Sequence, residues 1–335
     1  MPVYDLRFAK KQFNRVGLGL FAFLAATFAV EVVVVLIAAI VSPKLMQDPL
    51  FIAIAELVAS YGAGAAAALL IIRTAPKCTF VPQYKMNFKS ILLAFLAVQG
   101  LAYVGNLIGT TLMSFSEMIF GKTMENPVDA LLGEKGIGTY VTLFMVVVVA
   151  PVLEELIFRK AVIDALLPFG APAAILVSGL GFGLAHGNFF QFFYCALAGL
   201  FFAYIYVKTG KIRNTIILHA LLNFFGGAIP MLLSDSYEKL TNLLDGDLAL
   251  DPTFIYESLM EAGPAIIPAL IAVMFSVGTS ICGIILLIVN RRKFKSVPAT
   301  LPIPAGERGR TIFLNPGMLL FLTAGAALFI FSMIR

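Results

Sequence analysis

The amino-acid sequence predicts an all-α protein, a polytopic bundle of about 8–9 transmembrane helices. Of the 335 residues, 60% are hydrophobic and only 13% are charged, and the mean hydropathy is +0.95. Such a composition leaves too little charge to cover the surface of a soluble domain. The apolar residues also run continuously rather than alternating, which favours helices over the strands of a membrane β-barrel.

Nine apolar runs come close to the roughly 20 residues that a helix needs to cross a bilayer. In chain order these candidate spans cover residues 16–41, 51–72, 90–115, 138–167, 171–187, 189–207, 213–233, 264–290 and 314–334. The first follows a basic segment, as in a signal peptide, but its length and the lack of a clear cleavage site favour a retained span. The fifth is the weakest, because its roughly 17 residues rise only about 25 Å.

Charges in the connections predict how the spans are oriented. The basic connections are the N-terminal segment, the loop after the second span, the stretch between the sixth and seventh spans, and the segment after the eighth. The loops 116–137 and 234–263 are mainly acidic. Because lysine and arginine are retained on the cytoplasmic side, we predict a multi-pass protein of the cell membrane with a cytoplasmic N-terminus. We expect residues 1–335 to form a single integral membrane domain.

The composition also bears on partners. The net charge of +5 does not indicate nucleic-acid binding, because no basic patch is interleaved with aromatic residues. Cys78, Cys195 and Cys282 show no paired spacing, so we interpret them as small hydrophobic residues rather than as a disulfide framework. The expected surroundings of the chain are therefore the lipid bilayer, with no nucleic acid.

The fourth span carries two adjacent acids, Glu154 and Glu155, and Arg159 follows Glu155 by four residues. An acid followed four residues later by a base is the favoured order for an ion pair on a helix. Such a pair would neutralise Glu155 and leave Glu154, which points in another direction, as the free carboxylate. Ionisable groups inside apolar runs are costly and are functional candidates by default. The alternative is that the acids only mark the cytoplasmic end of a helix.

The chain contains only two histidines, and both lie in apolar runs. His186 ends the fifth span, four residues after Phe182, and His219 lies in the seventh span, four residues before Asn223. His219 and Asn223 share a helical face, so together they could direct two hydrogen-bond donors at a developing oxyanion. Each histidine could instead make only structural hydrogen bonds, to a backbone carbonyl or across a helix interface.

Taken in order, three motifs resemble those of the CAAX protease and bacteriocin-processing (CPBP, or Abi) family. They are Glu154-Glu155-x-x-x-Arg159, Phe182-x-x-x-His186 and His219-x-x-x-Asn223. Members of this family are intramembrane glutamic endopeptidases, and they include the type II CAAX prenyl proteases. The resemblance covers roughly residues 138–230 and implies a catalytic core in spans four to seven. The family usually has eight spans, one fewer than the nine apolar runs.

The resemblance implies a role for each motif residue. Glu154 would activate the hydrolytic water, with His186 helping to position or deprotonate it. His219 and Asn223 would stabilise the tetrahedral oxyanion. The remaining motif residues would support the site structurally; they are Glu155, Arg159 and Phe182. The expected substrate is a peptide or a membrane-protein precursor.

The motifs can meet only under one geometric condition. Straight helices would place His186 near the outer end of the fifth span and His219 nearer the inner end of the seventh. Both can approach Glu154 only if helices are tilted, broken or packed around a water-filled cavity.

Two other interpretations of the motifs remain open. His186, His219 and Glu154 could supply a three-ligand zinc site. The sequence contains no HExxH pair, so we favour a site without metal or other cofactor. The chain could also be a non-catalytic membrane protein, such as a bacteriocin immunity factor or a scaffold.

Polar residues outside the motifs suggest a third alternative. Glu31 and Glu56 lie in the first two spans, and a transporter would use such acids as relays. No inverted repeat is apparent, which makes a transporter the less favoured class. We expect packing or hydrogen-bonding roles for both acids, and Asn106 and Tyr140 are candidates to line a cavity.

Overall fold

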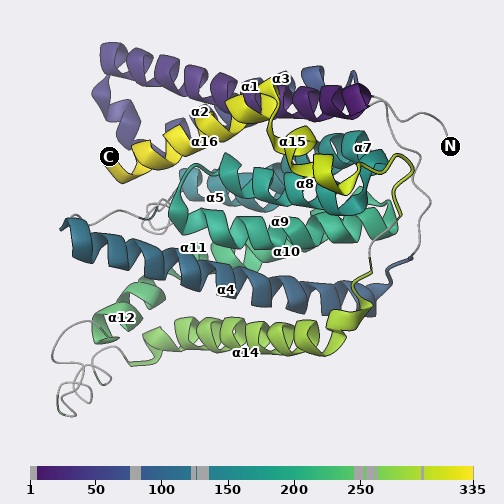
Figure 1. The fold of residues 1–335 in the computed structure, drawn as a ribbon. Coiled ribbons are helices and arrows are strands. Elements are labelled where there is room, and N and C mark those ends of the chain that lie inside the picture. The colour runs from purple at the N-terminus through teal and green to yellow at the C-terminus, as the bar shows by residue number, and fades with distance from the viewer. Residues whose placement is uncertain are drawn as a thin grey trace.

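The computed structural model describes residues 6–75, 84–121, 126, 136–244, 253, 260, 263–295 and 298–334. Cys78 and most of the two predicted acidic loops lie outside these residues. Within them the chain is helical and contains no strand, so the predicted all-α class is confirmed. The long helices lie side by side and run roughly along one direction (Figure 1).

Eight helices in the described ranges are long and apolar enough to cross a membrane. They are Leu6–Val41, Leu50–Ile72, Phe88–Phe120, Ile137–Phe169, Phe189–Thr209, Ile212–Leu232, Gly263–Lys293 and Pro316–Met333. Each corresponds to one of the predicted spans, as expected for a polytopic membrane bundle.

The predicted fifth span is a shorter helix, α8 (Ala171–Ala185), with only 15 residues. It rises about 22 Å, less than the roughly 30 Å of a bilayer core. The chain then reverses at Gly187, whose φ of 66° suits glycine, and the Asn188 side chain caps α9 (Phe189–Thr209). The division into nine spans is therefore corrected to eight spans and one short helix that packs back against α9.

Five of the spans contain one long α-helix each. These helices are α1 (Leu6–Val41), α4 (Phe88–Phe120), α9, α14 (Ile267–Asn290) and α16 (Pro316–Ile334). Shorter elements connect or flank them: η1 (Pro43–Gln47), α12 (Ser234–Leu244), η9 (Gly263–Ile266), η10 (Arg291–Lys293), η11 (Ala305–Glu307) and α15 (Arg308–Phe313).

The other three spans are interrupted by π-helical segments. The second consists of α2 (Pro49–Glu56), η2 (Leu57–Gly64) and α3 (Ala65–Ile72). The fourth consists of α5 (Ile137–Phe144), η4 (Met145–Val149), α6 (Ala150–Glu154), η5 (Glu155–Ala161), α7 (Val162–Leu166) and the 3-10 turn η6 (Leu167–Phe169). The third interrupted span consists of α10 (Ile212–Asn223), η7 (Phe224–Ala228) and α11 (Ile229–Leu232). Because π-helical turns are frequent at functional sites, these three spans are where a site is expected.

Glycines bring two pairs of continuous helices into close contact. A Cβ at Gly317 of α16 would overlap the backbone of Asn14 in α1. A Cβ at Gly283 of α14 would likewise overlap the backbone of Leu96 in α4. The Gly317 N–H also donates to Asn14 Oδ1 at 2.7 Å. As a result α16 lies along α1 and α14 lies along α4 (Figure 1).

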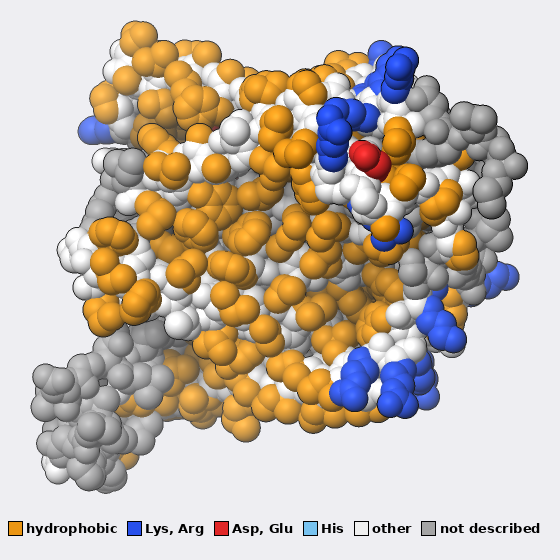
Figure 2. Space-filling model, in the orientation of Figure 1, with side chains coloured by type: hydrophobic (Ala, Val, Ile, Leu, Met, Phe, Trp, Pro, Cys, Tyr) orange, Lys and Arg blue, Asp and Glu red, His pale blue; other side chains and the backbone are white. Residues whose placement is uncertain are grey.

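Charge is distributed unevenly along the bundle. Lysine and arginine side chains gather at one end, where the start of α1 and the segment between α14 and α15 lie (Figure 1, Figure 2). Hydrophobic side chains cover the middle of the face shown in Figure 2. This separation is the one that the positive-inside rule produces, and the cytoplasmic position of the basic end stays a prediction.

Candidate active site

The two adjacent carboxylates lie where the fourth span changes from an α-helical to a π-helical segment. Glu154 is the last residue of α6, and Glu155 is the first residue of the π-helical segment η5. The Glu155 side chain is fully buried, whereas 14% of the Glu154 side chain is exposed. The two acids therefore have different surroundings, as expected for neighbours on one helix.

Glu155 forms the predicted ion pair. Arg159 Nε lies 3.2 Å from Glu155 Oε2, and both side chains are fully buried. The Arg159 guanidinium also lies over two aromatic rings, 4.6 Å from the centroid of Phe182 and 5.3 Å from that of Phe202. Buried charges are tolerated when they are paired, and aromatic faces attract a cation further. The pairing of Glu155 with Arg159 is confirmed, and Phe182 contacts the same arginine.

His219 of α10 lies between the two carboxylates. Its Nδ1 is 3.1 Å from Glu155 Oε1, and its Nε2 is 3.6 Å from Glu154 Oε2. The ring is buried and stacks on Phe202 with 5.3 Å between centroids. Since an ionised carboxylate only accepts hydrogen bonds, Nδ1 carries a hydrogen and Nε2 is the atom that faces Glu154. The 3.6 Å between Nε2 and Glu154 Oε2 is longer than a hydrogen bond, so the imidazole and this carboxylate are close neighbours there.

His186 reaches the same region from the end of α8. Its Nδ1 lies 2.9 Å from the backbone carbonyl oxygen of Phe182. A carbonyl oxygen can only accept, so Nδ1 carries the hydrogen and the lone pair of the neutral ring is on Nε2. The Phe182 ring packs edge-to-face against His186 at 5.0 Å and against His219 at 5.5 Å between centroids.

The two histidine rings thus both pack against the ring of Phe182, and His219 is the histidine that lies beside Glu154. Two features of the backbone account for this. α8 is short enough to end at His186 before it has crossed a full bilayer thickness. The fourth span changes from α-helical to π-helical hydrogen bonding after Glu154, and the wider π turn alters the direction of the side chains that follow.

Asn223 lies at the end of α10, one turn after His219. Its Nδ2 donates to the backbone carbonyl oxygen of Val146 at 2.8 Å. Val146 belongs to the π-helical segment η4, where the helix pattern of carbonyl hydrogen bonds is altered. In this position Asn223 joins α10 to the fourth span, and its amide nitrogen has a second N–H.

Tyr61 is a site residue that the sequence reasoning missed. It lies in η2 of the second span, and its hydroxyl donates to Glu154 Oε1 at 3.0 Å. The available signal was the polar pair Ser60 and Tyr61 inside an apolar run, but a single helix gives no indication of which neighbour it faces. The nearby Glu56 accepts a hydrogen bond from the Ser60 hydroxyl at 2.6 Å, which confirms the hydrogen-bonding role predicted for this acid.

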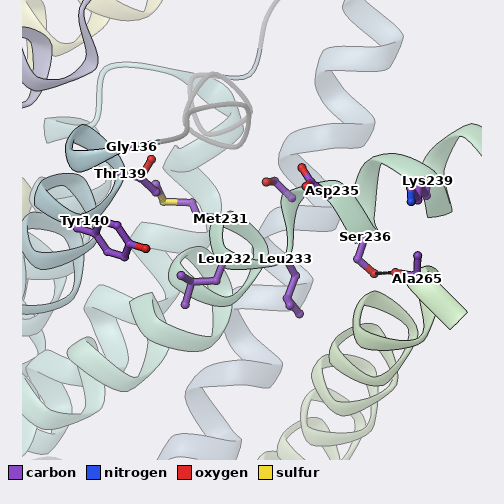
Figure 3. A pocket seen from close by; sticks show the side chains of 11 residues that line it. Gly136, Thr139, Tyr140, Met231, Leu232, Leu233, Asp235, Ser236, Lys239 and Ala265 are labelled. Carbon is purple, nitrogen blue, oxygen red and sulfur yellow. Dashed lines mark hydrogen bonds between the residues drawn. The ribbon is translucent and has the colours of Figure 1, made fainter.

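A separate pocket of about 360 Å³ opens between the start of α5 and the connection from α11 to α12 (Figure 3). Of the two residues predicted to line a cavity, Tyr140 lines this pocket and Asn106 does not. Asp235, Ser236 and Lys239 lie on the side of the pocket opposite Tyr140, where the Ser236 hydroxyl donates to the Ala265 carbonyl (Figure 3). None of the motif residues lines this pocket, so it is distinct from the carboxylate and histidine cluster.

Among the described residues, no group of three or more histidine, cysteine, aspartate or glutamate side chains is arranged to hold a metal ion. His219 directs its two ring nitrogens at two different carboxylates, which does not converge on one point.

Comparison with known proteins shows that the carboxylate and histidine cluster lies within a stretch of sequence that matches a protein-family model. The family model described as type II CAAX prenyl endopeptidase Rce1-like matches residues 136–225. The chain is 31% identical over 100 residues to CAAX prenyl protease 2 of Homo sapiens, which covers 24% of this chain and 30% of that protein. It is also 30% identical over 170 residues to the putative membrane peptidase YdiL of Bacillus subtilis (strain 168). This match covers 47% of this chain and 64% of that protein.

The chain therefore spans 30% to 64% of the length of these curated relatives. No solved structure matches it significantly. The matched segment contains all the motif residues, from Glu154 to Asn223, whereas Tyr61 lies outside it. The apolar helices and the membrane peptidase relative agree that this is a multi-pass membrane protein. Residues 136–225 are thus similar to the type II CAAX prenyl endopeptidases, and this similarity covers 90 of the 335 residues of the chain.

Proposed function

We propose that the chain is an intramembrane endopeptidase that hydrolyses a peptide bond with a water molecule activated by Glu154. The observation that carries this proposal is the difference between the two acids. Glu155 takes the arginine, and Glu154 faces His219 instead. A carboxylate beside an imidazole within an apolar bundle is costly, and such groups mark functional sites. The similarity to membrane peptidases supports the same class of reaction.

In the proposed reaction a water oxygen attacks the carbon of the scissile carbonyl group. Glu154 takes a proton from this water as a general base, and the carbonyl oxygen becomes an oxyanion. Collapse of the tetrahedral intermediate breaks the C–N bond, and the departing nitrogen takes the proton from Glu154. The products are a carboxylic acid and an amine, between which the remaining proton of the water is exchanged, and the enzyme forms no covalent bond with the substrate.

The proposed donors to the oxyanion are His219 and Asn223. His219 would donate from Nε2, the atom that faces Glu154. Its Nδ1 hydrogen is held by Glu155, so a second proton on Nε2 makes the ring a charge-assisted donor. Asn223 would donate the amide hydrogen that is not used on Val146. Donors held in place by such second contacts stabilise an oxyanion without reorganising.

His186 is proposed to position the attacking water. Because Phe182 holds the Nδ1 hydrogen, a neutral His186 ring has its lone pair on Nε2, which can accept a hydrogen from water. The ring shares Phe182 with His219, so it lies on the same side of the bundle as the proposed oxyanion donors. Glu154 and His186 together would then orient one water molecule.

The proposed substrate is a peptide or a membrane-protein precursor. The name CAAX prenyl protease 2 attaches a prenylated substrate to the human relative, and a lipid-modified peptide is one member of the class proposed here. We propose that the site works without a metal or other cofactor, because His219 directs its nitrogens to two separate carboxylates and the sequence has no HExxH pair.

The proposal can be tested in cells without knowing the substrate. Peptide fragments are compared by mass spectrometry between cells with the wild-type chain and cells with Glu154→Gln. We expect at least one cleavage product that requires the wild-type protein and disappears with the variant. Glu117→Gln, at the exposed end of α4, is the matched control and should keep the product.

The same comparison distinguishes the peptidase from a non-catalytic immunity factor or scaffold. A binding protein does not need the carboxylate to react, so its cellular function would survive Glu154→Gln. Full function of Glu154→Gln and His186→Ala at normal membrane levels would overturn the proposed activity.

A further inference from the structure

The tyrosine from the second span completes a continuous series of polar contacts. Arg159 Nε faces Glu155 Oε2 at 3.2 Å, and Glu155 Oε1 faces His219 Nδ1 at 3.1 Å. His219 Nε2 then faces Glu154 Oε2 at 3.6 Å, and Glu154 Oε1 accepts from the Tyr61 hydroxyl at 3.0 Å. Each contact uses a different atom, so no group in the series competes with another for the same partner.

This arrangement holds the Glu154 carboxylate on both sides. One oxygen is bonded to Tyr61 of the second span, and the other faces His219 of α10. A carboxylate that is fixed at one oxygen cannot rotate freely about its last side-chain bond. Its second oxygen is thereby directed at the imidazole and at any water that reaches it.

The neighbours of Tyr61 favour this contact over alternatives. Glu56 is the other carboxylate on the same span, and it already accepts the Ser60 hydroxyl at 2.6 Å. The span is also anchored next to Tyr61, because a Cβ at Gly64 would overlap the Thr27 and Phe23 side chains of α1. The backbone of η2 therefore has little room to turn the tyrosine away.

We propose that Tyr61 is a positioning residue for Glu154: its hydroxyl fixes the orientation of the carboxylate that activates water. This inference rests on the proposed peptidase activity and adds to it a residue outside the family segment at residues 136–225. Tyr61 acts through Glu154 and does not itself touch the reacting atoms.

The kinetic test replaces only the hydroxyl. Wild-type and Tyr61→Phe proteins are reconstituted in liposomes with a quenched fluorescent peptide built on the cleavage site found in cells. We expect kcat to fall roughly tenfold, with KM changed by less than about twofold, because a hydrogen bond to a charged group is lost at the reacting carboxylate only. A kcat equal to that of the wild type would overturn the inference.

Tyr206→Phe is the matched control for this substitution. The Tyr206 hydroxyl donates to Asp164 Oδ1 at 2.8 Å, so the control removes the same kind of bond from another carboxylate of the same span. We expect its kcat per folded molecule to stay within about twofold of the wild-type value. An equal loss of kcat in both variants would show that the Tyr61 effect is a general loss of packing, and it would also overturn the inference.

A spectroscopic test does not depend on the Tyr61→Phe variant folding well. Infrared difference spectra are recorded between the wild type and Glu154→Gln, each prepared with and without carbon-13 tyrosine. We expect one tyrosine C–O band to move when the acceptor changes from a carboxylate to an amide. Absence of any tyrosine band from the difference spectrum would contradict the contact.

The outcomes separate the inference from the activity on which it rests. If Glu154→Gln still cleaves the peptide, the proposed function itself is wrong. If Glu154→Gln is inactive while Tyr61→Phe matches the wild type, the function stands and the role of Tyr61 is wrong.

Discussion

Two clusters of charge lie little more than one turn apart on the fourth span, and they look alike in sequence. In the first, Glu155 pairs with Arg159; in the second, Lys160 pairs with Asp164. Each pair is four residues apart, and each cluster contains a carboxylate that accepts a tyrosine hydroxyl. These tyrosines are Tyr61, which bonds to Glu154, and Tyr206, which bonds to Asp164.

The clusters differ in burial and in the balance of charge. The Lys160 side chain is 49% exposed, and its positive charge is balanced by one acid, Asp164. The Arg159 side chain is fully buried and forms an ion pair with Glu155 only. The second acid of this cluster, Glu154, faces His219 instead. A charge pair with the favoured helical spacing is therefore not enough to indicate a site. The extra carboxylate beside an imidazole is the feature that does.

The largest effect outside the two acids is expected at the proposed oxyanion donors. Asn223→Ala should lower kcat by about 10²–10³, the usual loss for one preorganised donor, with a small change in KM. Steady-state kinetics in liposomes provide the measurement. Tyr206→Phe, in the other cluster, should leave kcat within about twofold. A normal kcat for Asn223→Ala would remove this residue from the proposed oxyanion site.

The next largest difference is expected in the free energy of unfolding, when the Glu155–Arg159 ion pair is compared with the Lys160–Asp164 pair. Arg159→Met leaves Glu155 as a buried charge without its partner, and breaking such a pair costs about 3–5 kcal/mol. Thermal unfolding in detergent should show a large decrease in Tm for this variant. If Arg159→Met were as stable as the wild type, the buried pair would not hold the site in the way described.

Lys160→Met is the paired measurement at the exposed cluster. A partly exposed ion pair contributes about 0–1 kcal/mol, so this variant should unfold within a few degrees of the wild type. Asp164 keeps its bond to Tyr206 after the lysine is lost. A decrease as large as that of Arg159→Met would erase the difference between the clusters.

The smallest effect is expected from metal removal. Treatment of the purified protein with a strong zinc chelator should change kcat by less than about twofold, because the proposed general base is a carboxylate that needs no metal. Elemental analysis of the same preparation provides the control for zinc content. Loss of activity that added zinc restores would favour the three-ligand zinc site instead.

Spacing along one helix predicted the local part of the site well. The order of Glu155 and Arg159 was enough to predict their pairing, since both residues lie on one helix and no other span is involved. The helical class and most span positions followed from the apolar runs for the same reason. Such features depend on near neighbours in the chain, and the sequence displays them directly.

Contacts between spans could not be predicted in the same way. The bond from Tyr61 to Glu154 joins residues 93 positions apart, and it depends on how η2 turns within the second span. The position of His219 between the two acids depends on how α10 packs against the fourth span, where the helix changes to a π-helical segment after Glu154. No local rule predicts where a helix changes to a π-helical turn, because the cause is the packing of neighbouring spans.

The central claim is that Glu154 is the reacting carboxylate and Asp164 a structural one. The most direct measurement compares Glu154→Gln with Asp164→Asn in purified, reconstituted protein, using the peptide identified in cells and counting only folded molecules. The account predicts a loss of kcat of about 10²–10⁴ for Glu154→Gln, the usual contribution of a general base, and near-normal kcat for Asp164→Asn. Equal activity of the two variants, or a greater loss with Asp164→Asn, would contradict it.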